Sequence, residues 1–422
     1  MHEDLLARLR DGRTAVWMRG PRTRPGRFDA AAASANVAEA EALWTRFAPA
    51  LAALFDTPDG SGRIFSPLLE YPAAPGLPGR IYVKADHALP ISACVKARGG
   101  VFGLLRIIES IAERAGLLDR PGSYAALTEE PARSELAKHT VVVASTGNLG
   151  FSIGIVAVAF GLQAEIHMSD CAKQWKKDRL RELGARVVEH SGDYTETVAA
   201  ARRSVAERAR AHFIDDENSR DLFLGYACAG RELHDQLLAA NIEVSPERPL
   251  VVYLPCGVGG APGGITYGLR AIYGDALVSV FVEPTDSACM LIALAGGYGQ
   301  PVSVYDVGLG NRTEADGLAV SRASPLVLAE VRDEIDAVVA VSEESLLQWV
   351  RRAWAEAHMK LEPSAAAALA AILPLGEAVA EGKHAGAPWR YLDDAVHVAW
   401  TTGGDMMPDA VFEGLLRQPG AK

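Results

Sequence analysis

Residues 140–164 have the sequence TVVVASTGNLGFSIGIVAVAFGLQA, which carries no charged side chain over a length that would span a membrane. Polar residues and glycines interrupt the apolar run near its start, in STGNLG (145–150). Such a cluster does not suit a membrane-spanning helix. It predicts instead a buried strand, a tight polar loop and a buried helix.

Strands and helices alternate along much of the remaining chain in the same way. Apolar strands separated by helices are typical of a parallel sheet with helices on its faces. Strands are expected at 80–86, 141–145, 164–169, 186–190, 212–215, 250–255, 278–284, 337–342 and 395–402. The predicted fold class is therefore α/β.

The length of the chain predicts two domains. At 422 residues the chain is too long for one simple core, and its strands fall into two separate sets. We expect each domain to hold a mainly parallel sheet flanked by helices. The large domain would comprise residues 1–109 and 225–422, and the small domain residues 110–224.

Composition and charge narrow the class of protein. The net charge of −11 argues against a protein that binds the phosphate backbone of nucleic acids. Five scattered cysteines without CxxC spacing fit a reducing cytoplasm and predict neither zinc nor disulfides. The charged N-terminal residues show no signal peptide. We therefore expect a cytoplasmic protein that binds neither membranes nor nucleic acids.

The stretch PISACVKARGG (90–100) places a lysine and two glycines in a predicted helix that begins near Pro90. Each glycine costs roughly 1 kcal/mol there relative to alanine. One interpretation is a solvated Lys96 beside glycines that serve tight packing. The other is that Lys96 is chemically active and that Gly99 and Gly100 allow close backbone approach.

The stretch LPCGVGGAPGG (254–264) lies between an expected strand and an expected helix. Its glycines let backbone N–H groups converge at the N-terminus of that helix, which suits a phosphate. Tight packing alone is one alternative. A dinucleotide-binding loop is another, because Gly257-x-Gly259 follows a strand and Glu283 ends the next strand.

Two further loops could carry chemistry. The asparagine and N–H groups of ASTGNLG (144–150) suit a carboxylate or a phenolic oxygen, although its polar residues would equally cap a helix. AWTTGGDMMP (399–408) ends a strand with hydroxyls that would face a bound ring or form a simple turn. With Lys96 and the glycine loop, these features meet the needs of pyridoxal phosphate (PLP): a Schiff-base lysine, an anion site and a partner for the ring nitrogen.

Several longer stretches resemble one known family, the bacterial D-serine dehydratases (D-serine ammonia-lyases), which are fold-type II PLP enzymes. The resemblance covers nearly the whole chain from about residue 35. It rests on LPISACVKARGG, STGNLGFSIGI, FIDDENSRDLFLGY, YLPCGVGGAPGG, EPTDSACML, EADGLAVSRAS, LEPSAAA and TTGGDMMP, in that order. It implies a tryptophan synthase β-like fold, PLP as cofactor, and β-elimination that converts D-serine to pyruvate and ammonia, with D-threonine a slower substrate.

The resemblance also implies roles for individual residues. Lys96 would carry PLP as a Schiff base, Asn148 would hydrogen-bond its phenolic oxygen, and Thr402 would face the pyridine nitrogen. The substrate carboxylate would be bound by Ser145, Thr146 and Gly147. The phosphate would be bound by the backbone N–H groups of Gly257, Val258, Gly259, Gly260 and Ala261. Whether Lys96 or Thr146 removes the Cα proton stays open.

The sequence departs from the pattern of this family at five positions. Cys94 and Val95 stand where smaller or more polar residues are expected, and Ala261 stands where glycine is usual. Arg312 and Asp405 add charge near the expected substrate entrance, which leaves open another 3-hydroxy amino acid, of the threonine or 3-hydroxyaspartate type. More distant alternatives are a dinucleotide-binding dehydrogenase and a non-catalytic metabolite-binding protein.

Glu283 resembles a cation-binding position of related enzymes. This resemblance implies a monovalent or structural cation, and the alternative is a strand-end carboxylate that caps a helix. The expected partners are a small amino-acid substrate and, in a small homo-oligomer, further copies of the chain; a monomer is equally compatible with the sequence.

Overall fold

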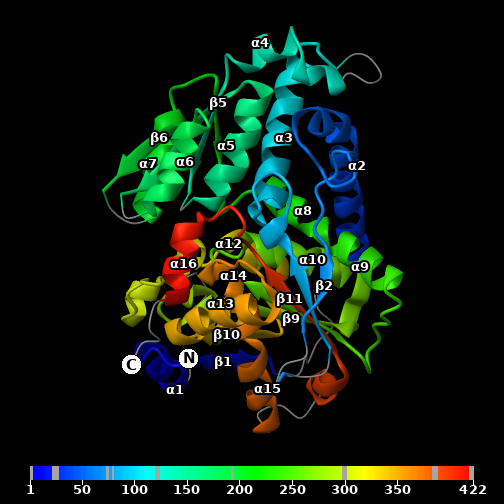
Figure 1. Ribbon diagram of the computed structural model, residues 1–422, viewed down its shortest axis with the longest axis vertical. Coiled ribbons are helices and arrows are strands. Elements are labelled where there is room, and N and C mark those ends of the chain that lie inside the picture. Colours follow the sequence, from blue (N-terminus) through cyan, green and yellow to red (C-terminus); the bar gives the residue numbers. More distant parts are fainter. Residues whose placement is uncertain are drawn as a thin grey trace. The chain divides into compact units, whose positions relative to one another are not determined.

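The computed structural model describes residues 3–20, 28–72, 76–77, 80–118, 124–145, 147–170, 172–191, 194–296, 302–382 and 388–417 (Figure 1). By their internal contacts these residues form two compact units. The large unit comprises residues 1–37, 66–88 and 226–422, and the small unit comprises residues 38–65 and 89–225.

The large unit is built on a seven-stranded sheet with the order β1-β10-β9-β8-β11-β3-β2. The five central strands are parallel, and β1 and β2 are antiparallel edge strands. Their bounds are β1 Ala15–Met18, β2 Leu68–Glu70, β3 Ile81–Ala85, β8 Leu250–Pro255, β9 Leu277–Pro284, β10 Ala337–Val341 and β11 Val396–Thr401. Every residue of the five central strands is buried, which explains their continuous apolar sequences.

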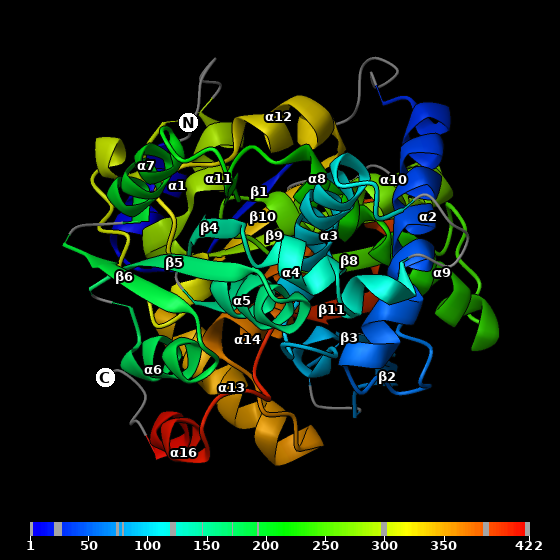
Figure 2. The ribbon, with the colours of Figure 1, turned by 90° about the horizontal axis from the view of Figure 1, so that it is seen from above.

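Helices of the large unit pack against this sheet (Figure 2). α10 contacts β9, α9 and α12, and α14 contacts β8 and β11. The helices of this unit are α1 Glu3–Arg10, α9 Ala229–Ala239, α10 Gly260–Tyr273, α11 Cys289–Ala295, α12 Pro325–Val331, α13 Glu343–Ala357, α14 Pro363–Ala370, α15 Ile372–Ala380 and α16 Asp409–Arg417. Two further helices, α2 Ala30–Leu54 and α8 Arg220–Ala227, contribute residues to both units.

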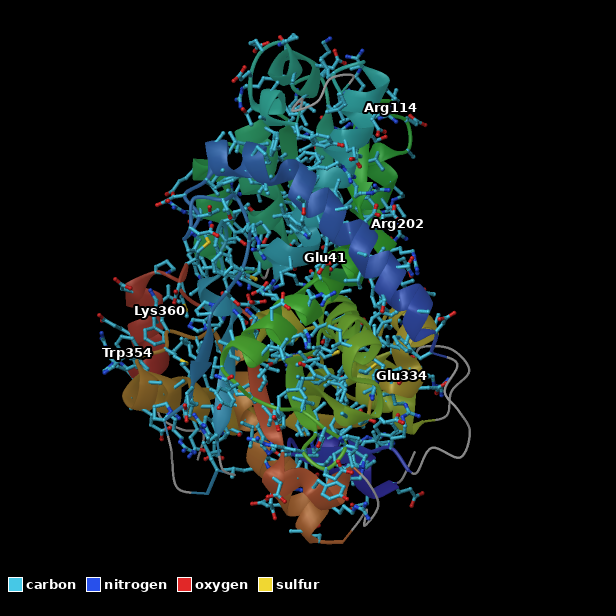
Figure 3. All side chains as sticks on the ribbon, turned by 90° about the vertical axis from the view of Figure 1, so that its right-hand side faces the viewer. Glu41, Arg114, Arg202, Glu334, Trp354 and Lys360 are labelled. Carbon is cyan, nitrogen blue, oxygen red and sulfur yellow. The ribbon has the colours of Figure 1, made fainter. Side chains whose placement is uncertain are left out.

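Side chains of α13 hold the C-terminal helix α16 in place. The Trp354 ring packs edge-on against Phe412 of α16, with ring centroids 5.2 Å apart. Lys360, which follows α13, forms an ion pair of 2.7 Å with Asp409 at the start of α16 (Figure 3). These contacts anchor the far end of the segment that leaves β11 and carries the TTGGDMMP sequence.

The small unit is built on a four-stranded, wholly parallel sheet with the order β6-β5-β4-β7. The strands are β4 Thr140–Ala144, β5 Gln163–Ser169, β6 Arg186–His190 and β7 Ala211–Ile214. The helices are α3 Lys96–Arg114, α4 Ala132–Leu136, α5 Asn148–Phe160, α6 Gln174–Glu182 and α7 Tyr194–Val205. α5 packs against α3 and against β5, and α7 packs against β4 and β5.

The structure confirms the α/β fold class and the strands expected from the sequence, with ends that differ by a few residues at most. The apolar stretch 140–164 forms β4, a loop and α5, as predicted. The edge strands β1 and β2 were not predicted, because segments of four and three residues are too short to show a periodic pattern.

A different stretch, Pro363–Ala380, is long and apolar enough to cross a membrane by length and composition alone. It forms α14 and α15, and 67% of it is buried inside the protein. The core helix of a globular protein passes the same test, so the stretch carries little weight as evidence for a membrane span.

The division into units assigns α3 differently from the predicted domains. The sequence placed residues 1–109 in the large domain, whereas the contacts of Leu89–Gly225 group α3 with the small sheet. Contact grouping does not show which residues move together, so the domain boundaries stay a prediction.

Candidate functional site

The glycine loop joins β8 to α10 and leaves a row of backbone amides without acceptors. Among the residues that the structure describes, none accepts a hydrogen bond from the N–H groups of Gly257, Val258, Gly259, Gly260 or Ala261. The loop is mostly buried, and α10 begins at Gly260. Buried amides without acceptors are costly, and the N-terminus of a 14-residue helix attracts negative charge. The loop therefore has the chemistry of an anion site.

Gly259 is required at this loop by both its conformation and its surroundings. Its φ of +106° lies in the left-handed region. A Cβ atom there would lie 2.8 Å from Cε of Met290 and 3.2 Å from Cγ1 of Val327. Tight packing was the alternative to a phosphate site at this loop. The structure shows both tight packing and amides that have no acceptor among the described residues. Ala261, the departure from the usual glycine, lies inside the first turn of α10.

The two threonines at the end of β11 have different surroundings. Thr401 is fully buried, and its hydroxyl donates to the carbonyl oxygen of Lys84 (3.1 Å) and lies 2.7 Å from Nδ1 of His87. Burial lowers the pKa of His87 to about 4, so the ring is neutral and its Nδ1–H donates to Thr401. Thr402 is half-buried, and no described residue hydrogen-bonds its hydroxyl. Thr402, not Thr401, is therefore free to contact a ligand.

Strand pairing brings Thr402 and the glycine loop to one edge of the large sheet. β8 and β11 are parallel neighbours, with Ala399 opposite Tyr253. Their carboxyl ends consequently lie side by side, and that edge of an open α/β sheet is where ligands bind. The structure thus places together two groups that are about 140 residues apart in the sequence.

A buried polar network lies beneath this edge. The Lys84 ammonium is fully buried and bonds the Ser66 carbonyl, the Ser66 hydroxyl and the Glu232 carboxylate. Asp86 accepts hydrogen bonds from the Ser66 hydroxyl (2.6 Å) and from Nε1 of Trp400 (2.8 Å). Because Lys84 is paired with Glu232 and both oxygens of Asp86 accept hydrogen bonds, the network fixes the ends of β3 and β11.

Glu283 is the penultimate residue of β9, and its carboxylate is fully buried. Both oxygens accept backbone hydrogen bonds from the start of α11, from Met290 (2.7 Å) and Leu291 (2.9 Å). Burial raises the pKa of Glu283 to about 8. The carboxylate therefore caps a helix, as the alternative interpretation expected. The described residues contain no group of three or more His, Cys, Asp or Glu side chains suited to a metal, and the cation at Glu283 stays a prediction.

In the small unit, Lys96 is the first residue of α3. The helix begins there rather than near Pro90, because residues 90–95 form turns in which Ile91 and Ala93 have positive φ. The Lys96 side chain is 19% exposed, and its Nζ lies 3.1 Å from Oδ2 of Asp216. Lys96 is thus neither solvated like a surface lysine nor buried in apolar surroundings: it is paired with a carboxylate.

Of the two glycines that follow Lys96, Gly100 serves helix packing. A Cβ atom on Gly100 would lie 2.7 Å from Cδ1 of Leu149, in the first turn of α5. The close approach predicted at Gly99 and Gly100 is therefore, for Gly100, an approach of α5 to α3.

The loop between β4 and α5 is organised by Ser145. Its hydroxyl oxygen accepts hydrogen bonds from the N–H groups of Gly147 (2.9 Å) and Gly150 (3.0 Å). Ser145 therefore caps α5, and the hydroxyl hydrogen is what it has left to donate to a ligand. Asn148 is half-buried at the first position of α5. Thr146 lies outside the described residues, so its predicted role finds no structural description here.

Asp216 is the residue that the sequence argument missed. It follows β7, the parallel neighbour of β4, so it lies at the same sheet edge as the Ser145 loop. The signal was present in FIDDENSR (213–220), where two adjacent carboxylates end an apolar strand.

The two charged departures lie in exposed positions of the large unit. Arg312 is exposed, and its backbone N–H donates to the Asp286 carboxylate (2.9 Å). Asp405 is exposed, and its N–H donates to the carbonyl oxygen of His87 (3.2 Å), which ties it to the region of Thr401.

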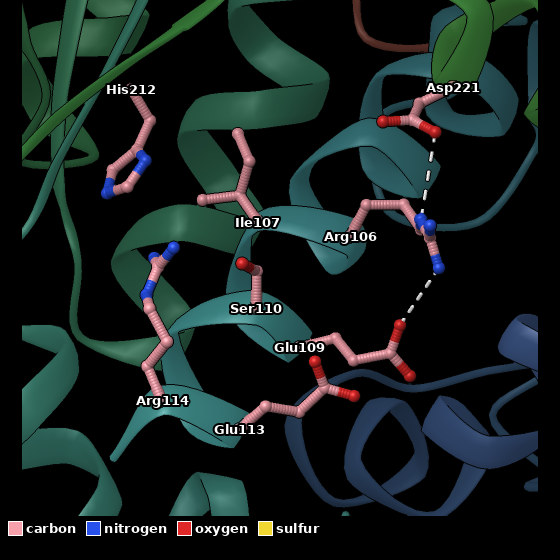
Figure 4. Close-up of a pocket in the computed structure, with 8 residues that line it drawn as sticks. All are labelled: Arg106, Ile107, Glu109, Ser110, Glu113, Arg114, His212 and Asp221. Carbon is pink, nitrogen blue, oxygen red and sulfur yellow. Dashed lines mark hydrogen bonds and ion pairs between the residues drawn. The ribbon is translucent and has the colours of Figure 1, made fainter.

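A separate pocket of about 530 Å³ opens on the small unit (Figure 4). Arg106 crosses part of it and forms ion pairs with Glu109 (3.1 Å) and Asp221 (3.6 Å). Arg114 and His212 lie on its opposite side (Figure 4). None of the residues predicted to carry chemistry lines this pocket, so it is not the candidate site.

Known proteins match this chain over nearly its whole length. Residues 62–387 match the family described as pyridoxal-phosphate dependent enzyme. The chain is 45% identical over 413 residues to a probable D-serine dehydratase from Burkholderia lata, covering 96% of this chain and 92% of that protein. It is 46% identical over 420 residues to a probable D-serine dehydratase from Burkholderia pseudomallei, covering 96% and 93%.

Solved structures support the fold. Diaminopropionate ammonia lyase from Escherichia coli superposes with a TM-score of 0.72 at 18% identity, covering 96% of this chain and 97% of that one. At that identity the likeness concerns the fold alone.

The glycine loop yields a first prediction. Gly259→Leu should weaken PLP retention by roughly 10- to 100-fold, because a side chain would displace the amides that are offered to the phosphate. Absorbance of bound PLP after gel filtration measures the effect, and the melting temperature reports the fold. The matched control is Gly274→Leu at the other end of α10, where φ is also positive but a Cβ atom meets nothing within 4 Å. Equal PLP retention in wild type and Gly259→Leu would mean that the phosphate binds elsewhere.

Proposed function

Because the chain belongs to the pyridoxal-phosphate dependent enzyme family, we propose that it is a PLP-dependent ammonia-lyase that converts D-serine to pyruvate and ammonia. The observation that carries this proposal is the identity of 45–46% to probable D-serine dehydratases over 96% of the chain. In the net reaction, water leaves by β-elimination and is returned when the resulting imine hydrolyses.

The residues present fit the cofactor. Five amides without acceptors at the N-terminus of α10 match the charge of its phosphate. Thr402 offers a free hydroxyl at the same sheet edge for the pyridine nitrogen. When bound, PLP supplies the aldehyde that takes up an amino group and the ring that accepts electrons from Cα. A dinucleotide-binding dehydrogenase would need Glu283 to hydrogen-bond the nucleotide. This alternative is disfavoured, because both oxygens of Glu283 already accept hydrogen bonds from α11.

The ring partner determines which reaction is favoured. A threonine hydroxyl cannot protonate the pyridine nitrogen as a carboxylic acid would, so the ring would withdraw electrons less strongly. A hydroxyl partner at Thr402 would therefore suit a reaction in which negative charge does not persist at Cα, such as β-elimination with loss of the hydroxyl group.

In the small unit, Lys96 would bind the cofactor and Asn148 would donate to its phenolic oxygen. The Asp216 carboxylate accepts a hydrogen bond from Lys96 Nζ and would orient that side chain. Ser145 would donate its hydroxyl hydrogen to the substrate carboxylate, since its oxygen already accepts two amides. Lys96 and Thr146 both remain candidates for removing the Cα proton.

The alternative function is dehydration of another 3-hydroxy amino acid. Of the two exposed charges, that of Arg312 favours the 3-hydroxyaspartate type, because it would attract a β-carboxylate, whereas Asp405 would repel one. We further propose a cytoplasmic enzyme, monomeric or a small homo-oligomer, in keeping with the free thiols of Cys94, Cys228, Cys256 and Cys289.

The purified protein should be yellow, and borohydride should fix PLP on Lys96. Peptide mapping by mass spectrometry identifies the lysine that carries the pyridoxyl group. Lys84 is the lysine to compare with Lys96. It lies in the large unit and is paired with Glu232, so we expect it to stay unlabelled. A label on Lys84 or any other lysine would overturn the assignment of Lys96.

Thr402→Asp should slow elimination and give a new long-wavelength absorbance band with D-serine. The physical reason is that a carboxylate would keep the ring nitrogen protonated and stabilise negative charge at Cα. Thr402→Ser, which keeps the hydroxyl, should retain normal spectra. If Thr402→Asp turns over like wild type with no new band, Thr402 does not contact the ring.

D-serine should be the best substrate in a keto-acid and ammonia assay. D-threonine should be slower by roughly 10- to 200-fold, since one extra methyl group changes binding by about 1–3 kcal/mol. L-Serine should be far poorer, because it cannot place its carboxylate, Cα–H and hydroxyl together in the same way. The panel also includes L-threonine and both 3-hydroxyaspartate series. A substrate that exceeds D-serine more than tenfold in kcat/KM would refute this specificity but not the β-elimination.

A further inference from the structure

The segment 401–405, in which the chain leaves β11, is attached at both ends to one residue, His87. The ring Nδ1 of His87 lies 2.7 Å from the hydroxyl oxygen of Thr401. Its backbone carbonyl oxygen accepts a hydrogen bond from the N–H of Asp405 (3.2 Å). Thr402 lies between these two attachments, so its position at the sheet edge depends on His87.

The hydrogen bonds at Thr401 have a fixed direction. A backbone carbonyl only accepts, so the Thr401 hydroxyl donates its one hydrogen to the carbonyl oxygen of Lys84 (3.1 Å). His87 is then the donor to the hydroxyl oxygen, through Nδ1–H. Burial lowers the pKa of His87 to about 4, so the ring is neutral at physiological pH and one tautomer satisfies this bond. The Thr401 hydroxyl is thus held between one donor and one acceptor, from the turn Asp86–Ala88 and from β3.

Holding this hydroxyl also fixes the backbone that leads to Thr402. One rotatable bond, χ1, separates a threonine hydroxyl from the backbone, and it is stiff because the side chain is β-branched. Thr401 is the last residue of β11, and successive side chains of a strand point to opposite faces. Beyond Thr402, the carbonyl oxygen of Gly403 accepts from the N–H of Glu362 (3.0 Å). The direction in which Thr402 projects is therefore set from both sides, and on the β11 side it is set through Thr401.

We propose that His87 is a positioning residue, which acts through Thr401 to aim the Thr402 hydroxyl at the pyridine nitrogen of PLP. This assignment rests on the proposed function, which places the ring nitrogen at Thr402. A donor that is already oriented loses less conformational entropy when its ligand binds, so its hydrogen bond contributes more to affinity.

The test measures how strongly the full-length protein prefers PLP over the PLP analogue in which CH replaces the ring nitrogen. The analogue displaces PLP from the holoenzyme in a competition titration, and the ratio of the two dissociation constants gives the preference. His87→Leu removes the donor and should lower this preference by roughly 3- to 10-fold, the range expected for the loss of one neutral hydrogen bond. Thr401→Val keeps the shape of the side chain, removes the hydroxyl and should lower the preference to the same extent.

A double variant shows whether His87 acts through Thr402. Thr402→Val should lower the preference for PLP at least as much as His87→Leu does. Adding His87→Leu to Thr402→Val should then lower it no further, because the hydroxyl that His87 positions is already absent. A merely structural role of His87 would weaken binding of PLP and of the analogue equally and leave their ratio unchanged.

The matched control is His397→Leu. His397 is a second buried histidine, near the opposite end of β11, and its ring bonds the hydroxyl of Tyr253 (2.9 Å) and the carbonyl oxygen of Leu392 (2.9 Å). This variant should lower the melting temperature and leave the preference for PLP unchanged. His87→Asn should keep most of the preference, because its side-chain amide nitrogen can donate from a place similar to that of Nδ1.

An unchanged preference in His87→Leu, beside a reduced one in Thr402→Val, would overturn the role of His87 and leave the contact of Thr402 with the ring intact. If His87→Leu does not fold, an unchanged preference in Thr401→Val overturns the proposal in the same way. An unchanged preference in Thr402→Val would contradict the ring contact itself and overturn both. Failure of the wild type to use D-serine would contradict the proposed substrate separately, since this measurement involves only the cofactor.

Discussion

The backbone amides of Gly257–Ala261 have no acceptors among the described residues, and this constraint organises the large unit. Buried N–H groups without partners cost free energy that the rest of the fold must offset. A phosphate at the N-terminus of α10 would remove that cost, because its oxygens would accept from these amides. Gly259 adopts its left-handed conformation against Met290 and Val327, so packing and the shape of the loop depend on the same glycine.

Parallel strand pairing then decides what stands beside that anion site. β8 and β11 end at one edge of the sheet, and the buried Lys84–Ser66–Asp86–Trp400 network holds β3 and β11 at that edge. The neutral His87 and the Lys84 carbonyl engage Thr401, which leaves the next hydroxyl, that of Thr402, available. Thr401 and Thr402 have identical side chains, and only their neighbours make one structural and leave the other available to a ligand.

In the small unit, too, parallel strands bring separate loops to one edge of the sheet. β4, β5 and β7 are parallel neighbours whose carboxyl ends carry the Ser145 loop, the start of α6 and Asp216. The hydroxyl oxygen of Ser145 accepts hydrogen bonds from the backbone at the start of α5. Asp216 forms an ion pair with Lys96, and the side chain of Lys176 packs against Gly147. The sequence interpretations of capping and of ligand binding at this loop are therefore compatible, because a hydroxyl that accepts two amides still has a hydrogen to donate.

The sequence by itself determined the α/β class and the identity of the strand-to-helix loops, because apolar runs broken by glycine and small polar residues have few other solutions. It also supplied the resemblance on which the roles of Lys96, Asn148 and Thr402 rest. Only the tertiary structure decided that Glu283 caps α11, that Gly100 admits Leu149, and that Asp216 and Lys176 belong beside Lys96 and Gly147 respectively. Those assignments depend on which strands become neighbours and which side chains meet across tens of residues, and no local pattern in the chain encodes such distances.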